Sequence, residues 1–200
     1  MTRLTKYLGR AEEIAADIKK HCGPWIKESK GLPGYRAARQ IQTKGWVSKK
    51  PVRTNRKSLT MNNTDHRFLD KLFKKYYGWA ARSNVLFTQG SPTTHYFYGP
   101  FKYAVFPIGS FKYLWTENFG DLAPVIDGLR YDIDHNFELP EDELESRARA
   151  RIEEIVKESY KSTGLHTALT KYKTHEIMVN CKEYFIIPEE IYDLHISKLI

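Results

Sequence analysis

Three polar side chains beside apolar segments are the residues of this chain best suited to chemistry. Glu176 directly precedes the apolar residues 177–179, Thr88 follows the apolar residues 85–87, and Arg36 lies in the short mixed segment 34–42. A carboxylate at the start of an apolar strand is costly to bury unless a partner or a ligand compensates its charge. An arginine can grip an anion through charge-assisted hydrogen bonds, and a hydroxyl can hold a carboxylate in one orientation. Together these side chains could bind an anionic ligand and stabilise positive charge that develops on it.

The order of arginine, hydroxyl-bearing strand and glutamate resembles the core of the ADP-ribosyltransferase family of the Arg-Ser-Glu type. Tyr-Arg at 35–36 is similar to the family's aromatic-Arg-Gly segment, and Phe-Thr-Gln-Gly-Ser at 87–91 stands where the family has Phe-x-Ser-Thr-Ser. Glu-Ile-Met-Val at 176–179, followed by Tyr-Phe-Ile at 184–186, is similar to the family's terminal strand pair. The block 83–109 also looks like small phage-encoded members.

This resemblance implies a mono-ADP-ribosyltransferase that moves ADP-ribose from NAD to a macromolecular acceptor, a protein or a nucleic acid, and releases nicotinamide. Breaking the bond between nicotinamide and ribose builds positive charge on the ribose, as in glycoside cleavage. By resemblance, the catalytic residues are Glu176, which would stabilise that charge, and Thr88, which would orient the carboxylate. NAD is the implied co-substrate, and no metal is expected. The implied NAD-binding residues are Arg36, Thr88, Gln89, Ser91 and Tyr98.

Several of these residues also have ordinary structural explanations. Glu176 could be a surface carboxylate at a strand edge, and Thr88 could be a simple β-branched strand residue. Arg36 could be solvated, with Arg39 as a rival for its role. Ser91 precedes Pro92, which is typical of a helix N-cap followed by proline at the first helical position.

The aromatic and basic neighbours of these residues leave further alternatives open. Tyr98 could stack on nicotinamide or simply pack in the core, and Tyr96 is the alternative stacking residue. Arg82 could bind phosphate, and His175 is expected to be a bystander. The polar stretch 164–175 leads into the glutamate and would be the acceptor-recognition loop.

Composition restricts the class of protein. The chain has 200 residues, 41% hydrophobic and 14% aromatic, which predicts one folded domain: a helical segment at 1–30 and a catalytic core at 31–200. We find no signal peptide, no apolar run of membrane-spanning length and no disulfide or zinc pattern in the two cysteines, so a cytoplasmic protein is expected, in the host cytoplasm if it is phage-encoded.

Charge supports a second functional reading. The net charge is +8, and basic residues concentrate in the segment 44–67. Such a segment could contact phosphates, so a non-catalytic nucleic-acid-binding module is the alternative to a transferase. An NAD glycohydrolase, with water as the acceptor, is a third possibility.

The order of the predicted elements favours an α+β domain on a mostly antiparallel sheet. Helical periodicity covers 4–22, 64–77 and about 140–162, and a further short helix is expected at 122–131. Separate strands are expected at 34–42, 85–87, 103–108 and 111–115; the last pair, 176–179 and 184–187, would flank a turn at 180–183. A short helix would run from Ser91 to Tyr98. By resemblance, the core would be an ADP-ribosyltransferase-like split β-sheet flanked by helices.

Overall fold

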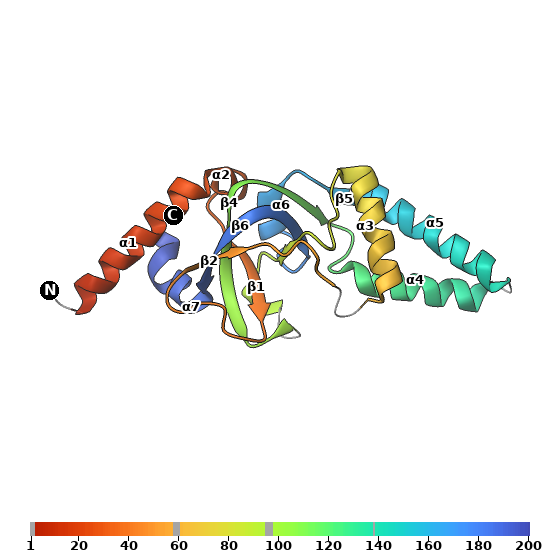
Figure 1. Ribbon diagram of the computed structural model, residues 1–200, viewed down its shortest axis with the longest axis horizontal. Helices are drawn as coiled ribbons and strands as arrows, with labels where there is room; N and C mark the ends of the chain where they lie inside the picture. The colour runs from red at the N-terminus through yellow and green to blue at the C-terminus, as the bar shows by residue number, and fades with distance from the viewer. Residues whose placement is uncertain (1–2, 58–60, 95–97, 138) are drawn as a thin grey trace.

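The computed structural model is elongated, with a central sheet and helices extending from both ends (Figure 1). The structure describes residues 3–57, 61–94, 98–137 and 139–200. The long N-terminal helix projects from one end, and a pair of long helices projects from the other. Among the described residues, no helix has the length and apolarity needed to cross a bilayer.

The helices lie close to the predicted positions. The predicted long helices at 4–22, 64–77 and 140–162 are confirmed, and the helix expected at 122–131 extends five residues further, to Asn136. Gly78, at φ +78°, ends its helix in the left-handed conformation that glycine adopts without strain. The helices are α1 Arg3–His21, α2 Gly23–Ser29, α3 Asn63–Tyr77, α4 Leu122–Asn136, α5 Glu141–Ser159, α6 Leu165–Thr170 and α7 Glu189–Ile191.

Short helical turns occupy two further places. The expected helix after Ser91 is a single 3₁₀ turn, Pro92–Thr94, and residues 95–97 lie outside the described part. At the C-terminus, α7 continues into a π-helical turn, Tyr192–Ile196, and a 3₁₀ turn, Ser197–Leu199.

The six strands form one antiparallel sheet, which confirms the α+β class. Two long strands, β4 and β6, pair along most of their length, and the other four flank them. β1 and β5 pair with β4, whereas β2 and β3 pair with β6. The strands are β1 Gly34–Ala38, β2 Ser48–Pro51, β3 Leu86–Thr88, β4 Phe101–Thr116, β5 Tyr160–Lys161 and β6 Ile177–Pro188.

Two predicted strand pairs are wrong, because each is one continuous strand. Residues 103–108 and 111–115 both belong to β4, and Gly109, at φ +70°, lies in a bulge instead of a turn. Residues 180–183, predicted as a turn, continue β6, with Lys182 exposed, Asn180 and Glu183 half-buried and Cys181 buried. There, Asn180 donates a hydrogen bond of 2.9 Å to the carbonyl of Asn84. The β1 prediction was too long, since the strand ends at Ala38.

The sheet curls so that its flanking strands β1 and β3 meet. Tyr35 and Gln89 exchange two backbone hydrogen bonds of 2.7 and 2.9 Å, which join the start of β1 to the residue after β3. Gly34 lies so close to Thr88 that a Cβ at position 34 would be 2.9 Å from the threonine side chain. The curl therefore places residues from the first, middle and last parts of the sequence side by side.

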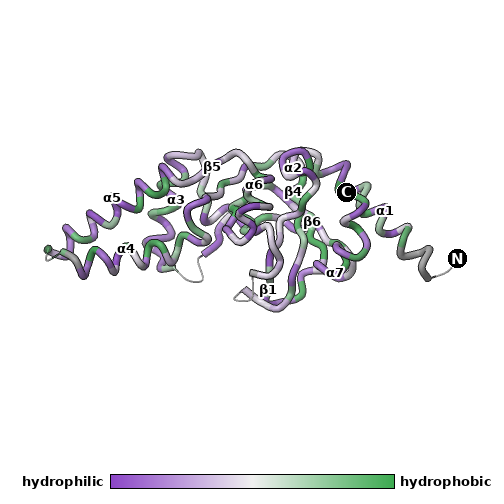
Figure 2. The backbone as a smooth tube through the Cα atoms, turned by 180° about the vertical axis from the view of Figure 1, so that it is seen from behind, coloured by the Kyte–Doolittle hydropathy of each residue, from purple (hydrophilic) through white to green (hydrophobic). Residues whose placement is uncertain are grey.

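Two hydrophobic clusters cover the two sides of this curled sheet. One joins the sheet to α1, α2, α6 and the C-terminal turns, and the other joins it to α3, α4 and α5. Figure 2 shows hydrophobic residues gathered in the central sheet, whereas hydropathy alternates along α5 at the far end. The two clusters together fix the strand ends that carry the candidate site.

Candidate functional site

Glu176 and Arg82 form a buried ion pair at the start of β6. Arg82 Nη1 lies 2.6 Å from Glu176 Oε1, and the side chains are only 7% and 16% exposed. Both backbones are held in place. The Glu176 N–H donates to the carbonyl of Gly120 at 2.8 Å, and the Arg82 N–H donates to Asp70 Oδ1 at 2.8 Å. The carboxylate is therefore presented from a fixed position.

Burial and neighbouring charges act on this pair in opposite directions. Burial raises the pKa of Glu176, and Arg82 opposes that shift. Burial disfavours the charged form of Arg82 as well, but Glu176, Tyr160 and Asp121 together more than offset this and raise the pKa of Arg82. A guanidinium stays charged at ordinary pH, so Arg82 favours the ionised form of Glu176 against the effect of burial. Asp121 and Tyr160 also act electrostatically on the pair.

A second guanidinium, that of Arg56, contacts the same aromatic ring as Arg82, the ring of Phe87. The guanidinium carbons of Arg56 and Arg82 lie 4.5 and 4.7 Å from the ring centroid, within cation–π range. The Arg56 N–H donates to the carbonyl of Ser83 at 3.1 Å. Burial and repulsion from Arg36 lower the pKa of Arg56 to about 10, so this cation is poorly compensated.

Arg36 is the third guanidinium of the cluster. On β1, its Nη1 donates to the Tyr184 hydroxyl at 2.9 Å, and its guanidinium lies 5.9 Å from that ring's centroid. Its Nε is buried without a hydrogen-bond partner in the described part of the chain. Its predicted rival, Arg39, is exposed and lies beyond the end of β1. The three guanidinium groups and Glu176 thus form what we call the arginine cluster: Arg36, Arg56, Arg82 and Glu176.

Thr88 and Gln89 contact the backbone beside Glu176. The fully buried Thr88 hydroxyl lies 3.5 Å from the carbonyl of Ile177, and Gln89 Nε2 donates to the carbonyl of Thr174 at 2.9 Å. These contacts hold the chain on both sides of Glu176. The predicted contact between the Thr88 hydroxyl and the Glu176 carboxylate is not made among the described residues, where Arg82 contacts the carboxylate instead.

The remaining predicted residues lie at the margin of the cluster. The Ser91 hydroxyl accepts a hydrogen bond from the Thr93 N–H at 3.3 Å, which favours the helix-cap interpretation. The Tyr98 hydroxyl lies 3.5 Å from Asp121 Oδ2, and burial together with Asp121 and Glu176 raises the pKa of Tyr98. Tyr96 lies outside the described residues. His175 Nδ1 lies 2.9 Å from the carbonyl oxygen of Thr116.

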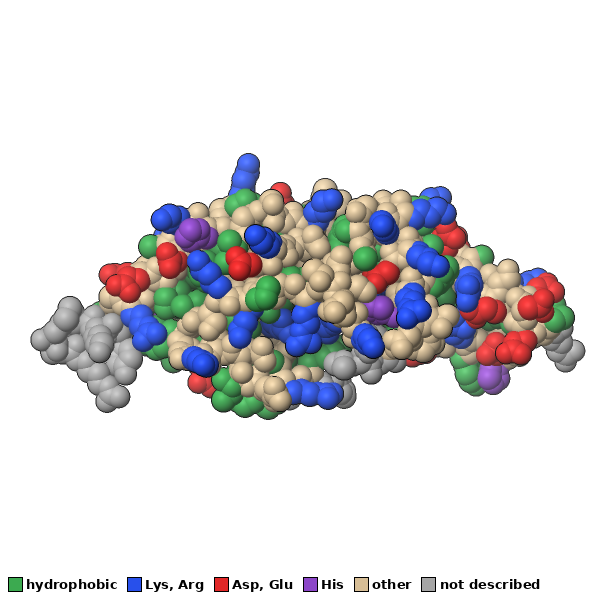
Figure 3. All heavy atoms as spheres, in the orientation of Figure 1, with side chains coloured by type: hydrophobic (Ala, Val, Ile, Leu, Met, Phe, Trp, Pro, Cys, Tyr) green, Lys and Arg blue, Asp and Glu red, His purple; other side chains and the backbone are tan. Residues whose placement is uncertain are grey.

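Sequence patterns indicated no role for Arg56 and only a possible phosphate contact for Arg82. Arg56 lies in the basic segment 44–67, which was a signal, but nothing in its spacing indicated the position of Phe87. Figure 3 shows lysine and arginine side chains gathered at the middle of one face of the molecule. In the described part of the chain, no group of three or more His, Cys, Asp or Glu side chains could hold a metal ion. Surplus positive charge around one carboxylate suits an organic anion such as a phosphate ester.

Comparison with protein-family models, curated proteins and solved structures gives no significant match for this chain. The geometry of the arginine cluster is therefore the basis on which a function is inferred.

Proposed function

We propose that this protein is an NAD-dependent ADP-ribosyltransferase whose site is the arginine cluster. The observation that supports this most is the meeting of three distant segments. β1 and the end of β3 exchange backbone hydrogen bonds at Tyr35 and Gln89, and Gln89 in turn contacts the segment that carries Glu176. The three segments that carry the arginine, the hydroxyl and the glutamate therefore lie next to one another.

The surplus cations fit the pyrophosphate of NAD. Arg36 and Arg56 repel each other electrostatically, so an anion between them would relieve unfavourable charge as well as form charge-assisted hydrogen bonds. The half-buried ring of Phe87 fixes Arg56 and Arg82 on its surface, which limits the conformational entropy lost on binding. An anionic ligand would therefore bind with little rearrangement.

Glu176 would act on the ribose next to the nicotinamide. Arg82 contacts Oε1 of Glu176, and in the proposed complex a ribose hydroxyl donates to Oε2. The C1′–N bond breaks with its electron pair leaving on nicotinamide, and the fixed carboxylate stabilises the positive charge that develops on the ribose. The acceptor's nucleophilic atom then bonds to C1′, and its proton passes to solvent or to Glu176. Arg82 is a positioning residue, since it acts through the carboxylate.

The acceptor would approach beside the segment between α6 and β6. Residues 164–175 were expected to form a polar loop, but α6 occupies 165–170 and is packed tightly against the turn after β3. A Cβ at Gly90 would lie 2.0 Å from the carbonyl oxygen of Leu169, so only glycine permits this approach. The acceptor-recognition surface is thereby reduced to residues 171–175.

The test is release of nicotinamide and transfer of labelled ADP-ribose from NAD to cell extract. Glu176→Gln should lower both rates about 100-fold or more, as expected when a fixed transition-state contact is removed. Glu145→Gln, which alters an acid far from the cluster, is the matched control and should keep full activity. Equal transfer by wild type and Glu176→Gln would refute the role of Glu176. Nicotinamide release that needs no acceptor would instead identify an NAD glycohydrolase.

A specific observation also favours nucleic-acid binding. Residues 44–57 contain six basic and no acidic residues, and β2 within this segment is an edge strand with Lys49 exposed. If about five cations contact phosphates, the logarithm of the binding constant for duplex DNA should fall with the logarithm of salt concentration with a slope of about −4. A shallow slope, with full NAD-dependent transfer to protein, would exclude this second candidate while leaving the transferase intact.

A further inference from the structure

The long strand β4 has an unpaired stretch on one edge. Its other edge pairs with β6, whereas the edge in question pairs with β1 only at 101–105 and with β5 only at 115–116. Among the described residues, no strand pairs with this edge between Phe106 and Leu114. Unpaired strand edges are templates for pairing with another chain, and proteins commonly protect them.

A cleft runs along this stretch. Its volume is about 720 Å³, within the range of ligand-binding pockets. The cleft is bounded by α2, by the C-terminal end of α3, by the edge itself and by the residue after β5. The lining residues are Pro24, Lys27, Glu28, Tyr76, Tyr77, Trp79, Ser110, Phe111, Lys112, Tyr113, Leu114 and Ser162. None of them belongs to the arginine cluster.

The side chains of β4 divide this cleft into two faces. Phe111 and Tyr113 belong to the hydrophobic cluster on the α2 side, and Leu114 belongs to the cluster on the α3 side. Because successive side chains of a strand point to opposite faces, Lys112 lies on the same side as Leu114. Each face therefore offers aromatic rings and one lysine, Lys27 on the α2 side and Lys112 on the α3 side.

The charges of the cleft favour an acidic occupant. Neither Lys27 nor Lys112 makes an ion pair within the described part of the chain, and both are exposed. The one acid of the lining, Glu28, receives a hydrogen bond of 3.4 Å from the Tyr113 hydroxyl. The carboxylates of a bound peptide could pair with the ammonium groups of Lys27 and Lys112, and its apolar side chains could pack on the aromatic lining residues.

We propose that this cleft binds an extended acidic peptide segment of a partner protein, which adds a strand to the free edge of β4. Residues 110–114 offer an edge of about 16 Å, long enough for five residues of an added strand. Main-chain hydrogen bonds to this edge would supply affinity, and the alternating rings and lysines would select alternating apolar and acidic side chains. A small planar ligand would use the rings but would leave the edge unpaired. This proposal does not depend on the transferase.

The experiment selects a displayed library of random octapeptides against the full chain. Ser162→Trp, which fills the cleft from an exposed lining position, serves for counter-selection, and Thr163→Trp is its matched control outside the lining. We expect peptides with acidic and apolar residues in alternation, enriched on wild type and Thr163→Trp and depleted on Ser162→Trp. No enrichment over Ser162→Trp would overturn the proposal.

The strongest selected peptide is then synthesised with and without N-methyl groups on alternate amides. N-methylation removes main-chain donors but keeps the side chains, so it should weaken binding at least about tenfold, and unmodified peptide should slow amide exchange at 110–114. Lys27→Glu with Lys112→Glu should also weaken binding at least about tenfold, whereas Lys19→Glu with Lys20→Glu, an equal charge change on α1, should not. Equal binding of the N-methylated and unmodified peptides would refute strand addition. Equal weakening by the Lys19→Glu and Lys20→Glu pair would refute the role of Lys27 and Lys112.

Discussion

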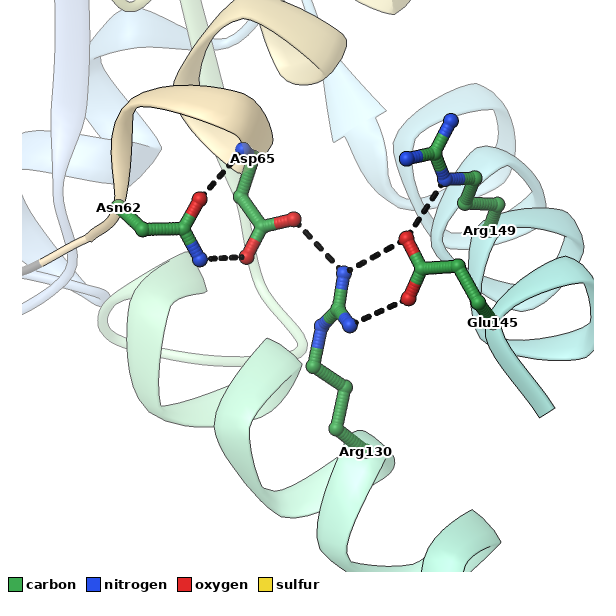
Figure 4. A network of polar contacts seen from close by, with 5 residues as sticks. All are labelled: Asn62, Asp65, Arg130, Glu145 and Arg149. Carbon is green, nitrogen blue, oxygen red and sulfur yellow. Dashed lines mark hydrogen bonds and ion pairs between the residues drawn. The ribbon is translucent and has the colours of Figure 1, made fainter. Parts of the chain in front are cut away.

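The protein pairs arginine with carboxylates in two regions that are built differently. Between α3, α4 and α5, Arg130 contacts Asp65 at 2.7 Å and Glu145 at 2.5 Å, and Arg149 contacts Glu145 at 2.7 Å (Figure 4). Asn62 adds two hydrogen bonds of 2.8 Å to Asp65, one of which caps α3. We call this set the helical network. Its arginines and acids are equal in number, and each acid is contacted by an arginine.

The arginine cluster lacks this balance. Arg56 is repelled by both Arg36 and Arg82, and Arg56 and Arg82 act on one acid, Glu176, with Asp121 as a second acid near Arg82 and Glu176. The cluster is also more deeply buried at its centre: Arg82 and Glu176 are 7% and 16% exposed, against 30% and 33% for Arg130 and Glu145. Ion pairs with equal numbers of positive and negative groups thus hold α3, α4 and α5 together. A buried excess of positive charge, as in the arginine cluster, is better explained by the binding of an anionic ligand.

The largest expected effect is on the cluster itself. Arg82→Gln leaves the Glu176 carboxylate buried without its ion-pair partner and should lower the free energy of unfolding by about 3 kcal/mol or more. Urea denaturation followed by fluorescence measures this change. Lys75→Gln, which removes an exposed ion pair with Glu153, is the control and should have no measurable effect. Equal free energies of unfolding for the two variants would show that the buried Arg82–Glu176 pair contributes no more to stability than the exposed Lys75–Glu153 pair.

Removing the centre of the helical network should cost less. Arg130→Gln breaks partly exposed charged hydrogen bonds to Asp65 and Glu145, and the free energy of unfolding should fall by about 1–2 kcal/mol. Nicotinamide release from NAD by the folded variant should stay at the wild-type rate. Loss of that activity at unchanged stability would show that the two regions are coupled, and the contrast drawn above would fail.

Inorganic pyrophosphate tests the surplus of charge. At about ten times its dissociation constant it should stabilise the wild type by about 1.4 kcal/mol, measured as a rise in melting temperature. Arg56→Gln should lose most of this gain, because it removes a poorly compensated cation of the cluster. Arg149→Gln, taken from the helical network, should retain it. If pyrophosphate still raised the melting temperature of Arg56→Gln but not that of Arg149→Gln, the anion site would lie in the helical network and not in the arginine cluster.

The smallest effect concerns pH. Hydrogen bonding to Arg130 lowers the pKa of Glu145, so its contribution is complete above the ordinary value of 4.5 and is lost as pH falls through the lowered value. The pKa of Glu176 is raised by burial, so its titration has the opposite sign and lowers stability as pH rises from 4.5 through the raised value. We expect wild type to exceed Glu145→Gln by about 0.5 kcal/mol near neutral pH, after solvent screening, and the difference to vanish toward pH 3. Unfolding curves at several pH values measure it. A difference that grew on acidification would contradict the sign.

Sequence patterns predicted the helices well and the strands less well, for a physical reason. Helical periodicity and the glycine after α3 depend on local spacing, which the sequence contains directly. The continuity of β4 and β6 depends on their pairing with each other, which lets a bulge absorb Gly109 and lets polar residues at 180–183 remain in the strand. Pairing between distant strands therefore outweighed the local preference for a turn, both at Gly109 and at residues 180–183.

The candidate site shows the same limit. Glu176 stood out because its charge directly precedes an apolar run, and the family resemblance supplied Arg36 as its companion. Arg82 follows α3 and Arg56 lies in a basic loop, and only the position of the Phe87 ring brings their guanidinium groups together. No local pattern encodes a contact between residues 26 positions apart in sequence, nor the neutralisation of Glu176 by Arg82 94 positions before it.

The hydrogen bonds between Tyr35 and Gln89 have a consequence for how the molecule matures. The arginine cluster takes side chains from residue 36 to residue 176, and its glutamate directly precedes β6. Pairing of such high contact order forms slowly. A nascent chain or a fragment that ends before β6 therefore lacks the assembled cluster, which forms only after β6 has been made and has paired with β3 and β4.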